Sequence, residues 1–64
     1  MITLTTQEQE QLNSHYNGFT IDESKTTVAP GADAGIHTSL LASGRTAHLY
    51  YDYAADHVYV FRVE

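Results

Sequence analysis

The chain has 64 residues, of which 42% are hydrophobic, and its eight acidic and three basic side chains give a net charge of −5. A chain this short sustains one hydrophobic core, so we expect a single small domain over residues 1–64 without a deep, enclosed active site. The negative charge disfavours direct binding to nucleic acid or to anionic lipid.

The absence of cysteine excludes disulfides and thiolate metal sites and favours a cytoplasmic protein. The longest apolar runs are far shorter than the roughly 20 residues of a membrane span. The N-terminus lacks the basic start and the hydrophobic stretch of a targeting signal. We therefore expect a protein that makes no contact with a membrane.

Residues 7–16 are predicted to form the one helix of the chain. Thr5 as N-cap with Glu8 three residues later matches a capping box, as does Thr6 with Gln9, and Gly18 can take the left-handed conformation that ends a helix. The apolar side of this helix is narrow, so we expect it to lie on a sheet with its other faces in water. The apolar residues of this side and of its two ends are Leu4, Leu12, Tyr16 and Phe19.

Two short strands, Phe19–Ile21 and Thr26–Ala29, are predicted to follow as a hairpin with a turn over residues 22–25. Both segments are rich in β-branched residues, which favour strands. Pro30–Gly35 contains one proline and two glycines and is predicted to be a loop between the two halves of the chain.

A second hairpin is predicted from Ile36–Ala42 and Arg45–Tyr53, joined by a two-residue Ser43-Gly44 turn. Pairing across this turn would collect apolar residues of both strands on one face. The resulting pairs are Ala42 with Arg45, Leu40 with Ala47, Thr38 with Leu49, and Ile36 with Tyr51.

The last hairpin is predicted around Ala54-Ala55-Asp56, with Tyr53 opposite His57. This register also sets Tyr51 opposite Tyr59, Leu49 opposite Phe61 and Ala47 opposite Val63. A one-residue slip is disfavoured, because it would place Val60 and Arg62 opposite the apolar row. The helix is then expected to cover Leu49, Tyr51, Tyr59 and Phe61. The predicted fold is α+β, one N-terminal helix packed on an antiparallel sheet of four to five strands.

Two arrangements in this register resemble chemical sites. His37 and His48 would be diagonal neighbours on one sheet face, but two ligands are too few for a metal and Asp52 lies too far along its strand. Ser39 would lie close to His48 and Asp52, but the chain has no GxSxG context and no evident oxyanion site. We expect no metal, no cofactor and no enzymatic activity.

Tyrosines and acids near the last hairpin point to a binding surface, because interfaces are enriched in tyrosine. Tyr51 and Tyr59 are expected in the core. Scattered acids are also typical of an ordinary solvated surface, which stays an alternative. The candidate partner-binding residues are Asp52, Tyr53 and Asp56 at the hairpin tip, a second acidic group of Asp22 and Glu23 in the first turn and Asp33 in the loop, and Tyr50.

In its small size, its acidity and its lack of cysteine and of a catalytic motif, the chain resembles the anti-CRISPR proteins, small inhibitors made by phages and mobile elements. The resemblance is one of composition over the whole chain and is carried by no residue motif. It implies a stoichiometric inhibitor in the cytoplasm of a host cell. Its carboxylates would take the place of phosphates in the basic nucleic-acid channel of a CRISPR effector, as a DNA mimic.

A structural or regulatory interaction module is the alternative from a different class. It would dimerise through an exposed strand edge, for which Thr26–Ala29 or the first strand are candidates. The chain is expected to be a monomer or a weak homodimer.

Overall fold

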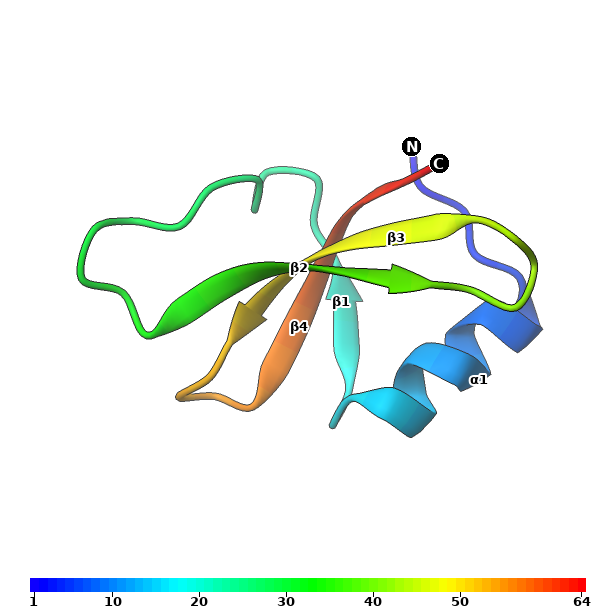
Figure 1. Cartoon of the computed structure of the whole chain (residues 1–64), viewed down its shortest axis with the longest axis horizontal. Helices are drawn as coiled ribbons and strands as arrows, with labels where there is room; N and C mark the ends of the chain where they lie inside the picture. The colour runs from blue at the N-terminus through cyan, green and yellow to red at the C-terminus, as the bar shows by residue number, and fades with distance from the viewer.

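The computed structural model describes residues 1–64 and contains one helix and one four-stranded sheet (Figure 1). The elements are α1 (Thr6–His15), β1 (Phe19–Ile21), β2 (Ala34–Leu40), β3 (Thr46–Asp52) and β4 (His57–Val63). The order of strands across the sheet is β1-β4-β3-β2. The predicted α+β class is confirmed, and four strands lie within the expected range.

The sheet is mixed, whereas the sequence predicted an antiparallel one. β1 runs parallel to β4, with Phe19 beside Val58 and Ile21 beside Val60. The predicted strand Thr26–Ala29 does not form, because residues 22–33 make a long loop that carries the chain to the opposite edge of the sheet (Figure 1). β1 gains two buried valines as neighbours in β4, a packing that a hairpin with Thr26–Ala29 could not supply.

Of the two capping boxes that the sequence allows, the one of Thr5 with Glu8 forms at the start of α1. The backbone N–H of Glu8 donates to Thr5 Oγ1 at 3.1 Å, and the N–H of Thr5 donates to Glu8 Oε1 at 2.9 Å. The helix ends at His15, one residue before the predicted end, and Gly18 has the expected left-handed backbone with φ 97°. Two reciprocal hydrogen bonds thus fix where the helix begins.

The β2–β3 hairpin has a register one residue away from the predicted one. Leu41 N–H donates to Arg45 O at 2.8 Å, so the loop is three residues, Ala42 to Gly44, with Gly44 at φ 93°. A three-residue loop with glycine in the left-handed position is a common hairpin closure. The pairs are therefore Leu40 with Thr46, Ser39 with Ala47, His37 with Leu49, and Gly35 with Tyr51.

This shift exchanges the two faces of β2. Leu41, only 2% exposed, enters the core, whereas Ile36 and Leu40 lie in solvent at 46% and 72% exposure. The predicted core positions of Ile36 and Leu40 are therefore wrong.

The β3–β4 hairpin also departs from the prediction near its turn. The turn contains four residues, 53–56, so Asp52 pairs with His57, Tyr51 with Val58 and Leu49 with Val60. A bulge between His48 and Leu49 then restores the predicted pair of Ala47 with Val63. Val58 and Val60 are consequently the buried residues of β4, and the expectation that Tyr59 and Phe61 face the helix is wrong.

The core lies between α1 and one face of the sheet. Its buried residues are Leu4, Leu12, Leu41, Ala47, Leu49 and Val60, with Ile2, Tyr16, Phe19 and Val63 packed against them. The predicted apolar side of the helix is confirmed. The other face, here called the open face, carries Ile36, Leu40, His48, Tyr50 and Tyr59, and no second layer of secondary structure covers it.

Candidate functional site

Three acids gather at the end of the molecule that holds the β3–β4 turn. Tyr53 N–H donates to the backbone oxygen of Asp33 at 3.0 Å, and Ala34 pairs with Asp52, so the start of β2 lies beside the turn. Asp56 closes the same turn. The sequence placed Asp33 in a separate acidic group, whereas the structure brings it to Asp52 and Asp56. We call Asp33, Asp52, Tyr53 and Asp56 the acidic end.

Two of these carboxylates are held in fixed positions. Asp52 Oδ1 accepts a hydrogen bond from Ala55 N–H at 3.1 Å. Asp56 Oδ1 accepts one from the Tyr51 hydroxyl at 2.6 Å, and its Oδ2 accepts one from Asn17 Nδ2 at 3.3 Å. Asp56 has a left-handed backbone, φ 50°, a conformation that Asp and Asn tolerate better than most residues. These hydrogen bonds therefore order both side chains.

The hydrogen bond between Tyr51 and Asp56 raises the pKa of the Tyr51 hydroxyl, and burial adds to the effect. A raised tyrosine pKa means that the fold favours the neutral phenol. Its contribution to stability is present below about pH 10, the ordinary tyrosine pKa, and is lost as the pH rises through the folded value.

We expect Tyr51→Phe to lower the melting temperature at pH 7 and to weaken its fall between about pH 9 and 11. Circular dichroism melts at several pH values measure both effects. Tyr50→Phe keeps the bond to Asp56 and should retain the wild-type pH dependence. Equal alkaline dependence in all three proteins would show that the Tyr51 hydroxyl does not carry the effect.

Aromatic side chains pack together at the acidic end. The Tyr53 hydroxyl lies 2.7 Å from His37 Nε2, and the Tyr51 and Tyr53 ring centroids are 5.0 Å apart. Gly35 permits this arrangement, because a Cβ at that position would collide with the Tyr53 hydroxyl. Tyr53 stays 46% exposed, so the acidic end presents an ordered aromatic surface next to its carboxylates.

The remaining candidate residues lie elsewhere. Asp22 N–H donates to Val60 O at 3.0 Å, which places Asp22 about 10 Å along β4 from the turn. The pKa of the Asp22 carboxyl is lowered, mainly by a hydrogen bond from the Ser24 hydroxyl and next by one from the Ser24 backbone N–H. Glu23 lies 3.9 Å from the N-terminal ammonium. Tyr50 is half-buried beneath Lys25, whose Nζ is 5.5 Å from the ring centroid.

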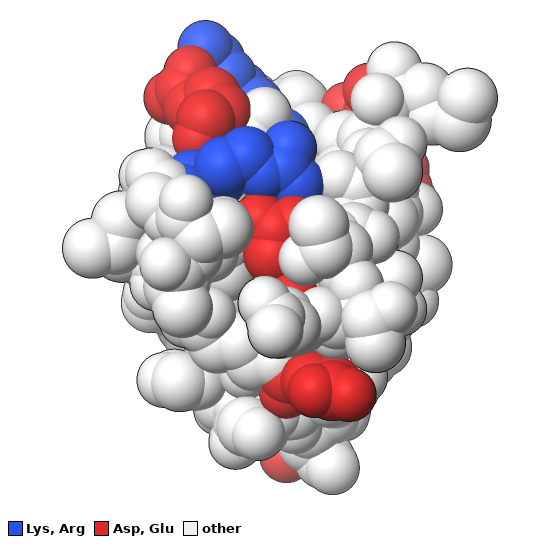
Figure 2. All heavy atoms as spheres, turned by 90° about the vertical axis from the view of Figure 1, so that its right-hand side faces the viewer, with Lys and Arg blue, Asp and Glu red and all other residues white.

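The three basic side chains each lie beside an acid. Arg45 pairs with Glu8 and Arg62 with Glu64, both at 2.6 Å, and Lys25 lies close enough to Asp22 to lower its pKa further. Figure 2 shows basic and acidic groups next to one another on the face that it draws. The net charge of −5 is therefore carried by the five other acids, Glu10, Glu23, Asp33, Asp52 and Asp56. Three of these five form the acidic end.

The histidine and serine arrangements considered from the sequence do not form. The register places His37 on the helix side and His48 on the open face, so they are not diagonal neighbours. Ser39 pairs with Ala47, and Thr38 is the residue opposite His48. No three His, Asp or Glu side chains lie close enough together to share a metal ion.

Sequence reasoning identified Glu8 only as a capping residue and missed its second role. Its side chain is 1% exposed and accepts hydrogen bonds from Arg45 Nε at 2.9 Å, Arg45 Nη2 at 2.6 Å and Ser43 Oγ at 2.6 Å. The sequence did contain a signal for this second role. Glu8 lies four residues before Leu12, so both side chains are on the buried face of the helix. Glu8 thus ties α1 to the β2–β3 hairpin.

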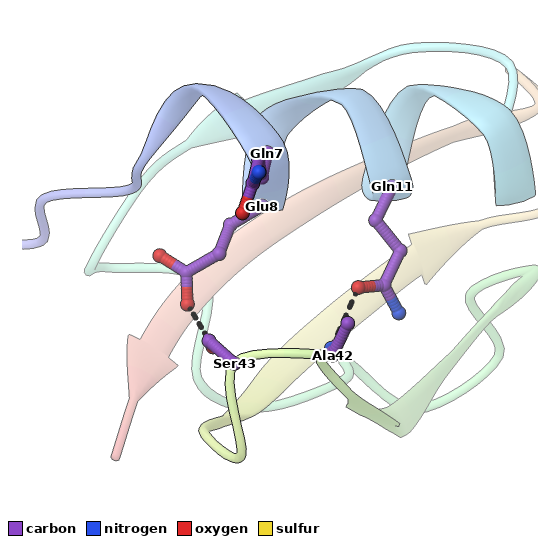
Figure 3. A pocket seen from close by; sticks show the side chains of 5 residues that line it. All are labelled: Gln7, Glu8, Gln11, Ala42 and Ser43. Atoms are coloured by element: carbon purple, nitrogen blue, oxygen red, sulfur yellow. Dashed lines mark hydrogen bonds between the residues drawn. The ribbon is translucent and has the colours of Figure 1, made fainter.

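Gln11 makes a second link between the same two elements. Its Oε1 accepts from Ala42 N–H at 2.8 Å, and its Nε2 donates to Leu40 O at 3.0 Å. Between these links lies a hollow of about 100 Å³, lined by Gln7, Glu8, Gln11, Ala42 and Ser43 (Figure 3). Every buried side-chain nitrogen and oxygen has a hydrogen-bond partner, so the hollow is part of a satisfied helix–hairpin contact.

The only helix, α1, has ten residues and is too short and too polar to cross a membrane. Compared with known proteins, the chain matches no family model, no curated protein and no solved structure.

Proposed function

We propose that the protein is a non-enzymatic inhibitor whose acidic end occupies a basic, nucleic-acid-binding surface of a partner protein. The observation that carries the proposal is the distribution of charge. Three of the five acids that lie beside no Lys or Arg gather at one end of the molecule, beside the exposed ring of Tyr53. Nucleic-acid-binding surfaces are rich in Lys and Arg, so carboxylates can stand where phosphates would bind.

Preorganisation supports the same function. Ala55 N–H holds Asp52, while Tyr51 and Asn17 hold Asp56, so binding would order few additional side chains. The Tyr53 ring offers a flat surface on which a guanidinium group can stack. An arginine from the partner could then contact the ring and a carboxylate together.

The partner that we propose is a CRISPR effector complex, in line with the resemblance to anti-CRISPR proteins in size and acidity. The inhibitor would come from a phage or mobile element and act in the cytoplasm of the host cell. By this route the protein prevents DNA from entering the basic channel of the effector and makes no direct contact with DNA itself.

The test measures how purified CRISPR effector complexes bind their target DNA, by electrophoretic mobility, with and without the protein. We expect the wild type to inhibit DNA binding and the double variant Asp52→Asn with Asp56→Asn to inhibit at least tenfold less. Removing a carboxylate that pairs with a desolvated Arg or Lys costs about 2–5 kcal/mol. Asparagine keeps an oxygen for the turn hydrogen bonds and tolerates the left-handed backbone, so folding should be retained.

The matched control is Glu10→Gln with Glu23→Gln, which changes the net charge equally but leaves the acidic end intact. This variant should inhibit within about twofold of wild type at physiological salt, where exposed charges farther apart than about 8 Å are screened. An equal loss in both variants would mean that only the overall charge matters. Inhibition that neither variant reduces, and that salt does not change, would refute electrostatic mimicry.

A further inference from the structure

The long edge of the sheet is unprotected. β2 is an edge strand of seven residues, Ala34–Leu40, which contains no charged residue and no proline and pairs with β3 in an unbroken register. The opposite edge, β1, has only three residues. Proteins usually block long edges with lysine, proline or a bulge, because the free backbone groups otherwise pair with another strand.

Hydrogen bonds at the two ends of β2 show which backbone groups of this strand point away from β3. Leu41 N–H donates to Arg45 O at one end, and Asp33 O accepts from Tyr53 N–H at the other. In an antiparallel pair, bonded positions alternate, so odd-numbered residues of β2 face β3 and even-numbered residues face outward. The outward residues are Ala34, Ile36, Thr38 and Leu40, and of their backbone groups Leu40 O already accepts a hydrogen bond from Gln11 Nε2. Ile36 and Leu40 also expose their side chains on the open face.

We propose that β2 pairs with β2 of a second copy of this chain, antiparallel and about a two-fold axis beside His37. With the two-fold axis beside His37, every outward residue lies opposite an outward residue of the second copy. Ile36 is then opposite Thr38, and Ala34 is opposite Leu40. A shift by two residues would leave an outward residue unpaired at each end. A two-fold contact of this kind is self-complementary.

Charge favours this partner and this direction. The strand is uncharged, so two chains that each carry −5 can approach along it without placing like charges in contact. In the antiparallel register, Asp33 of one copy lies opposite Leu41 of the other, at the hairpin end that bears Arg45. A parallel arrangement would instead bring the two acidic ends together, which electrostatic repulsion opposes.

The register predicts a specific cross-link. His37 would face His37 of the second copy in a non-hydrogen-bonded pair, where Cα atoms are about 4.5 Å apart and a disulfide can form. The chain has no cysteine, so His37→Cys introduces a single thiol. We expect it to form a disulfide-linked dimer under mild oxidation. Thr38→Cys is the matched control. In the proposed dimer the Cα atoms of position 38 in the two copies would be roughly 8 Å apart, too far for a disulfide, so this variant should cross-link at least tenfold less.

Sedimentation equilibrium of the wild type tests the association without a cross-link. We expect dimers at concentrations on the order of 100 µM, because one strand pair is a small interface. Thr38→Pro should weaken dimerisation at least tenfold, since the N–H that it removes points outward and not toward β3. Ile36→Lys, which places a charge on the edge, is a second variant that does not depend on proline being tolerated. Circular dichroism confirms that each variant is folded.

Three results would overturn the proposal. The first is a wild type that stays monomeric at concentrations on the order of 1 mM, far above the expected range. The second is equal cross-linking of His37→Cys and Thr38→Cys. The third is a dimer that neither Thr38→Pro nor Ile36→Lys weakens. None of these measurements depends on the acidic end, so this proposal and the proposed function succeed or fail separately.

Discussion

Leu49→Ala is expected to remove most of the stability of the fold. Leu49 is fully buried in the cluster that also contains Leu12 and Val60. Truncating a buried leucine costs about 2–5 kcal/mol, because it removes apolar contacts and leaves a cavity. A chain of this length has roughly 3–10 kcal/mol of stability in total. Urea unfolding followed by circular dichroism measures the loss as a lower midpoint.

Phe61→Ala is the informative comparison. Phe61 lies at the bulge, half-buried beside His48, with ring centroids 6.1 Å apart. We expect its truncation to cost less than half as much as Leu49→Ala, although phenylalanine is the larger side chain. A larger loss for Phe61→Ala would mean that this residue and not Val60 faces the helix, and that the β3–β4 register is wrong.

Glu8→Gln is expected to lower the melting temperature by roughly 10 °C, since it replaces a buried carboxylate that accepts charge-assisted hydrogen bonds from the 40% exposed Arg45 side chain. The Glu8 carboxylate receives hydrogen bonds from the Arg45 guanidinium, the Ser43 hydroxyl and the Thr5 backbone. A glutamine can accept some of these bonds but carries no charge for Arg45. A differential scanning calorimeter measures the change at pH 7.

The same contacts predict how stability depends on pH. The hydrogen bonds from Arg45, then from Ser43 and Thr5, hold the pKa of Glu8 far below its ordinary value of 4.5. A carboxyl whose pKa is depressed by folding contributes stability that is complete above the unfolded pKa and is lost as the pH falls through the folded value. The melting temperature should therefore be level above about pH 5 and fall below it.

Glu8→Gln should flatten this acid dependence. Asp22 and Glu64, whose pKa values are also lowered, account for the part that remains. Glu10→Gln, an exposed acid on the same helix, should retain the full wild-type slope. An unchanged slope in Glu8→Gln would assign the acid sensitivity to the other two carboxyls.

The helix was predictable because its signals are local. Thr5 and Glu8 lie three residues apart and Gly18 follows closely, so no distant part of the chain had to be known. The strand registers depended on loop length and could not be decided in this way. In β4, Val58 and Val60 alternate with Tyr59 and Phe61, so both faces are apolar and period-two alternation fits either register.

The acids of the candidate site were visible in the sequence, but their grouping was not. Asp33 meets the last turn only because residues 22–33 cross to the far edge of the sheet. The pairing of Glu8 with Arg45 likewise joins residues 37 positions apart. Composition gives the net charge, whereas the fold determines which acids lie beside a base and which do not.

Gln11 has a consequence for any strand that adds to β2. Its amide accepts from one backbone group of the hairpin and donates to another, as the backbone of a neighbouring strand would. An incoming strand would have to share Leu40 O with Gln11, and one that slid beyond Leu40 would have to displace both bonds. Gln11 therefore opposes the sliding of an added strand toward the β2–β3 turn, a movement of the kind that lets edge strands grow into fibres.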